Sequence, residues 1–166
     1  QGIENKFKSY LPTNNVAYTK KVLEEVGGFN ENFDRPGAED VELCLKIQKR
    51  RYEVGLNEKA IVYHYHSNRL KERLKQNFNF GVGDITFMSI YPSKKKFNPF
   101  FILYIPFLSL RMSLKYIKNS KKKVLYFPII YFLNLSGLLS NFIGRFIYSF
   151  KKKKLSLSLY TPLHKF

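Results

Sequence analysis

The sequence predicts an α/β region over residues 1–90, followed by a basic, apolar helical region over residues 91–166. In the first region, apolar residues at helical spacing alternate with short runs rich in β-branched and aromatic residues. In the second region, long uncharged runs alternate with lysine clusters. The charge is divided in a similar way, because residues 1–66 hold ten basic and ten acidic side chains, whereas residues 67–166 hold all 17 net positive charges.

Local signals predict the first elements. The alternation in NNVAYT predicts a short strand, and Thr19 then provides a side-chain oxygen that can cap a helix through Val26. Gly27 or Gly28 can end this helix in the left-handed conformation. Residues 29–38 are rich in Asn, Asp, Pro and Gly, so we expect a loop there.

A second helix is predicted over residues 39–51, because Val41, Cys44 and Leu45 recur along one face. Cys44 is the single cysteine of the chain, so no intrachain disulfide can form, and we expect it on the apolar side of the helix. The next two runs, YEVGL and AIVYHYH, are separated by the turn-like NEK and predict two short strands.

A third helix is predicted to begin at Ser67, with Leu70, Leu74 and Phe78 at helical spacing. The two glycines of FGVGD are poor helix formers, so we expect the helix to weaken there.

Two apolar runs follow. Residues 97–110 carry no charge but contain two prolines and fall short of the roughly 20 residues that cross a bilayer, so they predict an interfacial or re-entrant segment. Residues 124–144 are uncharged and long enough to span, and Ser136, Gly137 and Ser140 are small enough for close helix packing.

Lysine clusters at residues 94–96, 121–123 and 151–154 flank both apolar runs on both sides. The positive-inside rule would place all three clusters on the cytoplasmic side. Hairpins or in-plane helices therefore fit better than one clean crossing, and we expect the region to be membrane-associated.

Glu39 and Asp40 stand together at the start of the second predicted helix. An acidic pair in a first turn complements the helix dipole and caps free N–H groups, which is a structural role. A carboxylate kept ionised by a helix N-terminus beside a glycine loop can also act as a general base on a hydroxyl group. The pair by itself leaves both interpretations open.

His64 and His66 are two residues apart, so they would project from the same side of a strand. Neutral imidazole is a good ligand for a divalent metal, but two histidines make at most half of a site. The alternative is a pair without a metal at a strand end.

The order of these segments carries a resemblance. NNVAYTKKVLEEVGGF, then GAED, then YEVGL and VYHYH, over about residues 10–85, resembles the C-terminal part of the catalytic domain of family 2 glycosyltransferases. The resemblance implies the GT-A fold, here as its acceptor-side half over residues 1–90. It also implies transfer of a sugar from a nucleotide sugar to a hydroxyl acceptor.

The resemblance implies a role for each matching residue. Asp40 matches the family's catalytic base and Glu39 its acidic neighbour, whereas His64 and His66 match the position of a histidine near a nucleotide-bound divalent metal, Mg or Mn. Three further residues match segments that shape the donor and acceptor pocket: Asn15, Gly28 and Gly37.

Departures from the family pattern also have implications. Lys46 stands where the family has an arginine, and the Q-x-x-R-W motif of processive synthases is missing, which favours transfer of a single sugar. The family's nucleotide-binding half, with its D-x-D motif, would precede residue 10. We therefore expect a truncated or split product that is inactive alone and is completed by a longer chain or a separate polypeptide.

The expected setting is the membrane, with the catalytic part on the cytoplasmic side and a lipid-linked or membrane-proximal acceptor. The rival hypothesis is a non-catalytic basic protein that binds a membrane surface or nucleic acid. Lysines interleaved with aromatic residues would suit nucleic acid. Here the lysines cluster outside the apolar runs, which disfavours nucleic acid.

Overall fold

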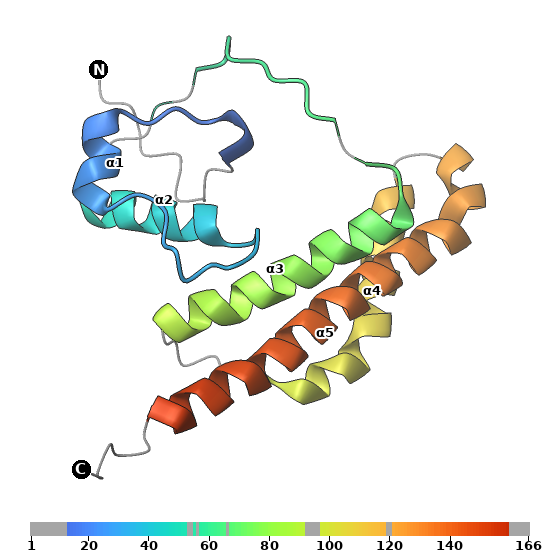
Figure 1. Cartoon of the computed structure of the whole chain (residues 1–166). Helices are drawn as coiled ribbons and strands as arrows, with labels where there is room; N and C mark the ends of the chain where they lie inside the picture. The colour runs from blue at the N-terminus through green and yellow to red at the C-terminus, as the bar shows by residue number, and fades with distance from the viewer. Residues whose placement is uncertain are drawn as a thin grey trace.

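The computed structural model describes residues 13–52, 55, 57–65, 67–91, 97–118 and 121–159, without the side chains of residues 121–123 and 152–159. These residues form helices and irregular segments, with no strand among them (Figure 1). In chain order the elements are η1 (Thr13–Asn15), α1 (Lys20–Val26), α2 (Glu39–Lys49), α3 (Leu70–Ile90), η2 (Pro99–Tyr104), α4 (Ile105–Ile117), η3 (Lys121–Tyr126) and α5 (Phe127–Leu159).

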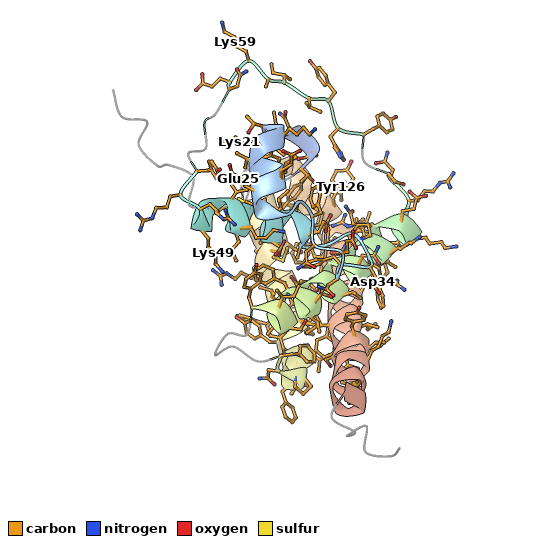
Figure 2. The ribbon with its side chains drawn as sticks, turned by 60° about the vertical axis from the view of Figure 1, so that its left-hand side comes forward. Lys21, Glu25, Asp34, Lys49, Lys59 and Tyr126 are labelled. Carbon is orange, nitrogen blue, oxygen red and sulfur yellow. The ribbon has the colours of Figure 1, made fainter. Side chains whose placement is uncertain are left out.

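The predicted α/β, partial GT-A fold is therefore wrong for the described residues. In place of the strand predicted in NNVAYT, Asn14 and Asn15 belong to the 3-10 helix η1 and residues 16–19 are irregular. Residues 57–65 form an extended arch whose outermost bend carries Lys59 (Figure 2). A strand is stable only when its backbone groups pair with a neighbouring strand, and no described segment pairs with this arch. Ile61 and Tyr63 in the arch are exposed. Most of YEVGL lies outside the described residues.

The predictions for α1 are confirmed. The Thr19 hydroxyl oxygen accepts a hydrogen bond from the Val22 amide at 3.4 Å, and Gly27 ends the helix with a φ of 74°. Residues 29–38 contain no helix or strand, as predicted.

The second predicted helix is confirmed with a shorter end. α2 begins at Glu39 and ends at Lys49, two residues before the predicted boundary, because Arg51 adopts a φ of 61°. Leu43, Cys44 and Ile47 are buried, so the cysteine does lie on the apolar side.

The predicted weakening of α3 at FGVGD is wrong, because the helix continues through it to Ile90. The glycines are used for close packing instead. A Cβ atom on Gly81 would lie 2.0 Å from the carbonyl oxygen of Asn141 in α5, and one on Gly83 would lie 1.9 Å from that of Gly37. Backbone from two directions therefore approaches one turn of α3.

α3 and α5 lie side by side and run in the same direction (Figure 1). The Ser140 hydroxyl donates to the Leu74 carbonyl at 2.7 Å, and further along both helices Arg145 donates to Asp84 at 2.6 Å. Gly137 also lies in this contact, beside the side chain of Asn77. Close packing at Gly137 and Ser140 is thus confirmed.

α4 packs against α5 in a helical hairpin that is joined by η3. The Phe97 and Phe142 rings lie 5.6 Å apart near one end, and Ser109 donates to the Tyr131 carbonyl at 3.0 Å nearer the turn. Two segments, Pro99–Ile117 and Val124–Lys151, are long and apolar enough to cross a membrane by length and composition. The first is longer than the 14 residues seen in the sequence, because η2 and α4 together extend to Ile117.

Candidate functional site

The segment that precedes α2 is anchored on α3 and α5. The Tyr148 hydroxyl in α5 lies 3.3 Å from both carboxylate oxygens of Asp34. The Arg35 guanidinium lies over the Phe78 ring in α3, 5.8 Å from its centroid. Residues 34–40, which we call the acidic loop and which include the first two residues of α2, are therefore positioned by two helices from distant parts of the chain.

Gly37 is the point of closest approach between this loop and α3. Its φ is 145°, and a Cβ atom there would lie 2.8 Å from the Asn79 carbonyl oxygen. Only glycine adopts this backbone conformation readily and leaves room for α3. The sequence linked Gly37 with a substrate pocket, and the structure gives it a packing role.

Glu39 and Asp40 both accept backbone hydrogen bonds, but they do so differently. A carboxylate oxygen of Glu39 accepts from the Gly37 amide at 2.5 Å and so closes the turn of its own loop. Asp40 Oδ1 accepts from the Val41 amide at 2.8 Å, and no described residue donates to its Oδ2. Both side chains thus complement the positive end of α2, and Asp40 retains an oxygen that can accept a proton.

Sequence reasoning missed Glu42, which is 1% exposed. Its Oε1 accepts from the Tyr91 hydroxyl at 2.9 Å, and its Oε2 lies 3.3 Å from Lys46 Nζ. Lys46 also donates to the Gly28 carbonyl at 2.6 Å. A buried carboxylate is stable only when it is paired, so this cluster holds α2 against both the end of α1 and the end of α3. The signal in the sequence was an acid inside the apolar stripe of α2.

Tyr18 is a second residue that the sequence did not single out. Its hydroxyl oxygen is buried and has no hydrogen-bond partner among the described residues. Burial raises the pKa of this phenol above its ordinary value, and the nearby Cys44 and Asp40 raise it further. Tyr18 is therefore a neutral hydrogen-bond donor near the acidic loop.

The other predicted pocket residues lie elsewhere. Asn15 donates to the Ala60 carbonyl at 2.9 Å and so connects η1 to the arch of residues 57–65. Gly28 has a φ of 61° and is held by Lys46. Neither has a hydrogen bond to the acidic loop, so the structure does not bring Asn15, Gly28 and Gly37 together through such contacts.

His64 lies in a separate cavity of about 570 Å³ at the start of α3. Glu72 and Arg73 also line it, whereas no residue of the acidic loop does. His66 lies outside the described residues. Among the described residues, no group of three or more His, Cys, Asp or Glu side chains could hold a metal ion, so the role of His64 and His66 as metal ligands stays a prediction.

Comparison with known proteins gives one match. The model of the family described as Glycosyl transferase family group 2 matches residues 2–143. No curated protein and no solved structure gives a significant match. The family match extends beyond residues 10–85, where the motifs lie, and takes in α3, α4 and the first half of α5. The chain therefore belongs to the family 2 glycosyltransferases.

Proposed function

We propose that this chain takes part in the transfer of a sugar from a nucleotide sugar to a hydroxyl acceptor, with Asp40 as the general base. Membership of a glycosyltransferase family supports the reaction class over the non-catalytic alternative. The observation that supports the role of Asp40 is its position. It stands in the first turn of α2, on a loop anchored by two helices, with one carboxylate oxygen that no described residue uses.

The proposed step is a single displacement. The acceptor oxygen forms a bond to the anomeric carbon while the bond from that carbon to the nucleoside diphosphate breaks. Asp40 takes the acceptor proton on Oδ2, while its Oδ1 accepts a hydrogen bond from the Val41 amide, which fixes the direction of the carboxylate. Glu39 holds the loop turn and acts as a positioning residue.

The donor needs groups that these residues do not supply. Family 2 glycosyltransferases commonly use a divalent metal, but the 166 residues contain no D-x-D sequence. We propose that the donor diphosphate and its metal are held by aspartates from outside these residues, in a longer chain or in a separate polypeptide. Without that part, we expect no sugar transfer.

The proposed location is the cytoplasmic face of a membrane. Two apolar helical segments support membrane association, and the lysine clusters beside them support the cytoplasmic side. Because the acidic loop rests on α3 and α5, a lipid-linked acceptor would reach Asp40 from the membrane surface.

The test is an Asp40→Asn variant, assayed with the donor-binding part supplied. Transfer of labelled sugar from a panel of UDP- and GDP-sugars to membrane lipids should fall about 10²- to 10⁴-fold, the range that a general base contributes. Glu31→Gln is the control, because it neutralises an exposed carboxylate in the segment that precedes α2 and leaves the anchors of the acidic loop, Asp34 and Arg35, in place. Circular dichroism should show both variants folded. Transfer by Asp40→Asn at the rate of the control would refute the assignment of the base.

A further inference from the structure

The exposed face of α4 and η2 is apolar, and its buried face carries hydroxyl groups. Five large apolar residues recur at intervals of three and four, and all are at least 37% exposed: Phe100, Leu103, Phe107, Leu110 and Leu114. Toward α5, by contrast, Ile105 is buried together with Ser109 and Ser113. A helix in water shows the opposite arrangement, so this face, the α4 stripe, fits an apolar solvent.

α5 has a similar apolar face on the side away from α3. Its large exposed residues are Ile129, Phe132, Ile143, Phe146, Ile147 and Phe150. The residues that contact α3 lie on another side of the helix and are small or polar, among them Gly137, Ser140 and Arg145. The hairpin of α4 and α5 thus presents apolar side chains outward from both of its helices.

Basic residues lie at both ends of this hairpin. Lys115 and Lys118 are exposed at the end of α4, and Lys151 is exposed where the apolar part of α5 stops. The sequence adds lysines at residues 121–123 and 152–154. Each lysine near an anionic membrane surface contributes about 1 kcal/mol of binding, so both ends of the hairpin are attracted to the same lipid headgroups.

The charged residues at the start of α3 distinguish between a hairpin that crosses the membrane and one that lies on its surface. Ser140 donates to the Leu74 carbonyl, so the beginning of α3 lies beside the middle of α5. At 1.5 Å per residue, Ser140 is about 16 Å from Lys151 and about 24 Å from Val124 along the helix axis. Five exposed charged side chains surround Leu74 or precede it: Arg69, Lys71, Glu72, Arg73 and Lys75.

If Val124–Lys151 crossed the bilayer, these charges would lie deep in the hydrocarbon. If only residues 124–144 crossed, Ser140 would still lie about 6 Å inside the hydrocarbon. Because α3 and α5 run in the same direction, the charged residues of α3 that precede Leu74 would lie deeper still. Each basic or acidic side chain near the centre costs about 2.5–3.5 kcal/mol. A hairpin that lies in the plane of the membrane avoids these costs.

We infer that the hairpin of α4 and α5 lies flat in the interface of an anionic bilayer, with α3 on its water side. This inference rests on the proposed membrane association and adds its geometry. The α4 stripe enters the acyl region, the terminal lysines meet the headgroups, and α3 carries the acidic loop above the surface. Neither helix crosses the membrane.

The chain has no tryptophan, so a single introduced tryptophan reports the depth of one site. We would place it in three variants of the full chain, Phe100→Trp, Phe107→Trp and Leu114→Trp, all at exposed positions of the stripe. The variants are bound to vesicles of phosphatidylcholine and phosphatidylglycerol that contain lipids brominated at defined depths. The outer two sites are about 21 Å apart along the helix.

An in-plane hairpin predicts quenching at one shared, shallow depth for all three tryptophans. A crossing helix predicts that the central tryptophan lies about 10 Å deeper than the outer two, and that result would overturn the inference. Flotation of the same vesicles tests membrane association separately, and failure to float would overturn both the inference and the association. Sugar transfer is not part of either measurement, so the catalytic proposal stands or fails independently.

Single cysteines provide a second measurement that tolerates local changes. In a Cys44→Ala background, Lys118→Cys places a thiol at the end of α4, and Lys151→Cys places one where the apolar part of α5 stops, so the two sites lie at opposite ends of the hairpin. A membrane-impermeant maleimide added to sealed vesicles with externally bound protein should label both sites from the outside. Labelling of only one of the two sites would show that α5 crosses the bilayer.

Discussion

The glycines of α3 and α5 predict opposite effects for the same substitution. Gly81→Ala adds a methyl group 2.0 Å from the Asn141 carbonyl oxygen, a backbone atom that cannot move without α5. Gly137→Ala adds one 3.4 Å from the side-chain amide of Asn77, which can adjust. Gly81→Ala should therefore destabilise the protein, and Gly137→Ala should stabilise it.

The magnitudes follow from two competing terms. Replacing glycine by alanine within a helix gains about 0.8–1 kcal/mol in either position. At Gly81 the methyl group must move by about 1.4 Å to reach the 3.4 Å of an ordinary contact, and overpacking of this kind costs about 1–3 kcal/mol. Because the obstacle is backbone, we expect the upper part of that range and a net loss of about 1–2 kcal/mol.

The assay is thermal unfolding in detergent, followed by circular dichroism at a fixed protein-to-detergent ratio. For a chain of this length, each kcal/mol shifts the Tm by about 2–4 °C. Gly81→Ala should lower the Tm by several degrees, and Gly137→Ala should raise it by a few. If both variants raised the Tm equally, the close contact of α3 with α5 would be wrong.

Three other substitutions test the acidic loop and its support. Gly83→Ala places a methyl group 1.9 Å from the Gly37 carbonyl oxygen and should displace the acidic loop by more than 1 Å. A displacement of this size should reduce sugar transfer about 10²-fold, and an unchanged rate would refute the packing of the acidic loop against α3. Tyr91→Phe removes the hydrogen bond to Glu42 and should lower the free energy of unfolding by about 1–3 kcal/mol at neutral pH. Burial, and after it the hydrogen bond to Glu42, raises the pKa of Tyr91. The stabilisation by Tyr91 should therefore be complete below about pH 10 and be lost as the pH rises through the raised pKa. If the difference in unfolding free energy between Tyr91→Phe and wild type did not shrink at alkaline pH, this prediction would be contradicted. Tyr18→Phe removes a buried hydroxyl without a described partner, so unfolding should show the variant to be at least as stable as wild type, and a large loss would reveal a partner.

The local helix signals in the sequence were sufficient for α1 and α2. Thr19 and Gly27 act through groups within a few residues, so their roles as caps could be read from the sequence. The strands could not be predicted correctly, because a strand depends on a partner that may lie anywhere in the chain. The run AIVYHYH has the composition of a strand, yet its described residues have no described neighbour with which to pair.

The glycines of α3 led to a wrong prediction because their role also depends on distant parts of the chain. Gly81 and Gly83 weaken a helix considered alone, but here they admit backbone from α5 and from the acidic loop. Tertiary packing therefore overrides the intrinsic preference of the residues.

The candidate site was partly predictable. The acidic pair at the start of α2 was visible because both the position and the residue types are local. The hydrogen bonds from Tyr148 to Asp34 and from Tyr91 to Glu42 could not be predicted, because the partners are 114 and 49 positions apart in the sequence. Glu42 was passed over because burial of a charged side chain depends on partners that periodicity does not show.

The packing of α3 on α5 has a practical consequence for dissecting the protein. A soluble fragment that ends at Ile90 would expose Val82 and Ile85, which Tyr148 now covers, and it would release Asp34 from its anchor. Such a fragment should aggregate or adopt a different loop conformation, so inhibitors or acceptors screened against it would meet a site that the intact protein does not present. Biochemical work on the acidic loop therefore needs a chain that contains both α3 and α5.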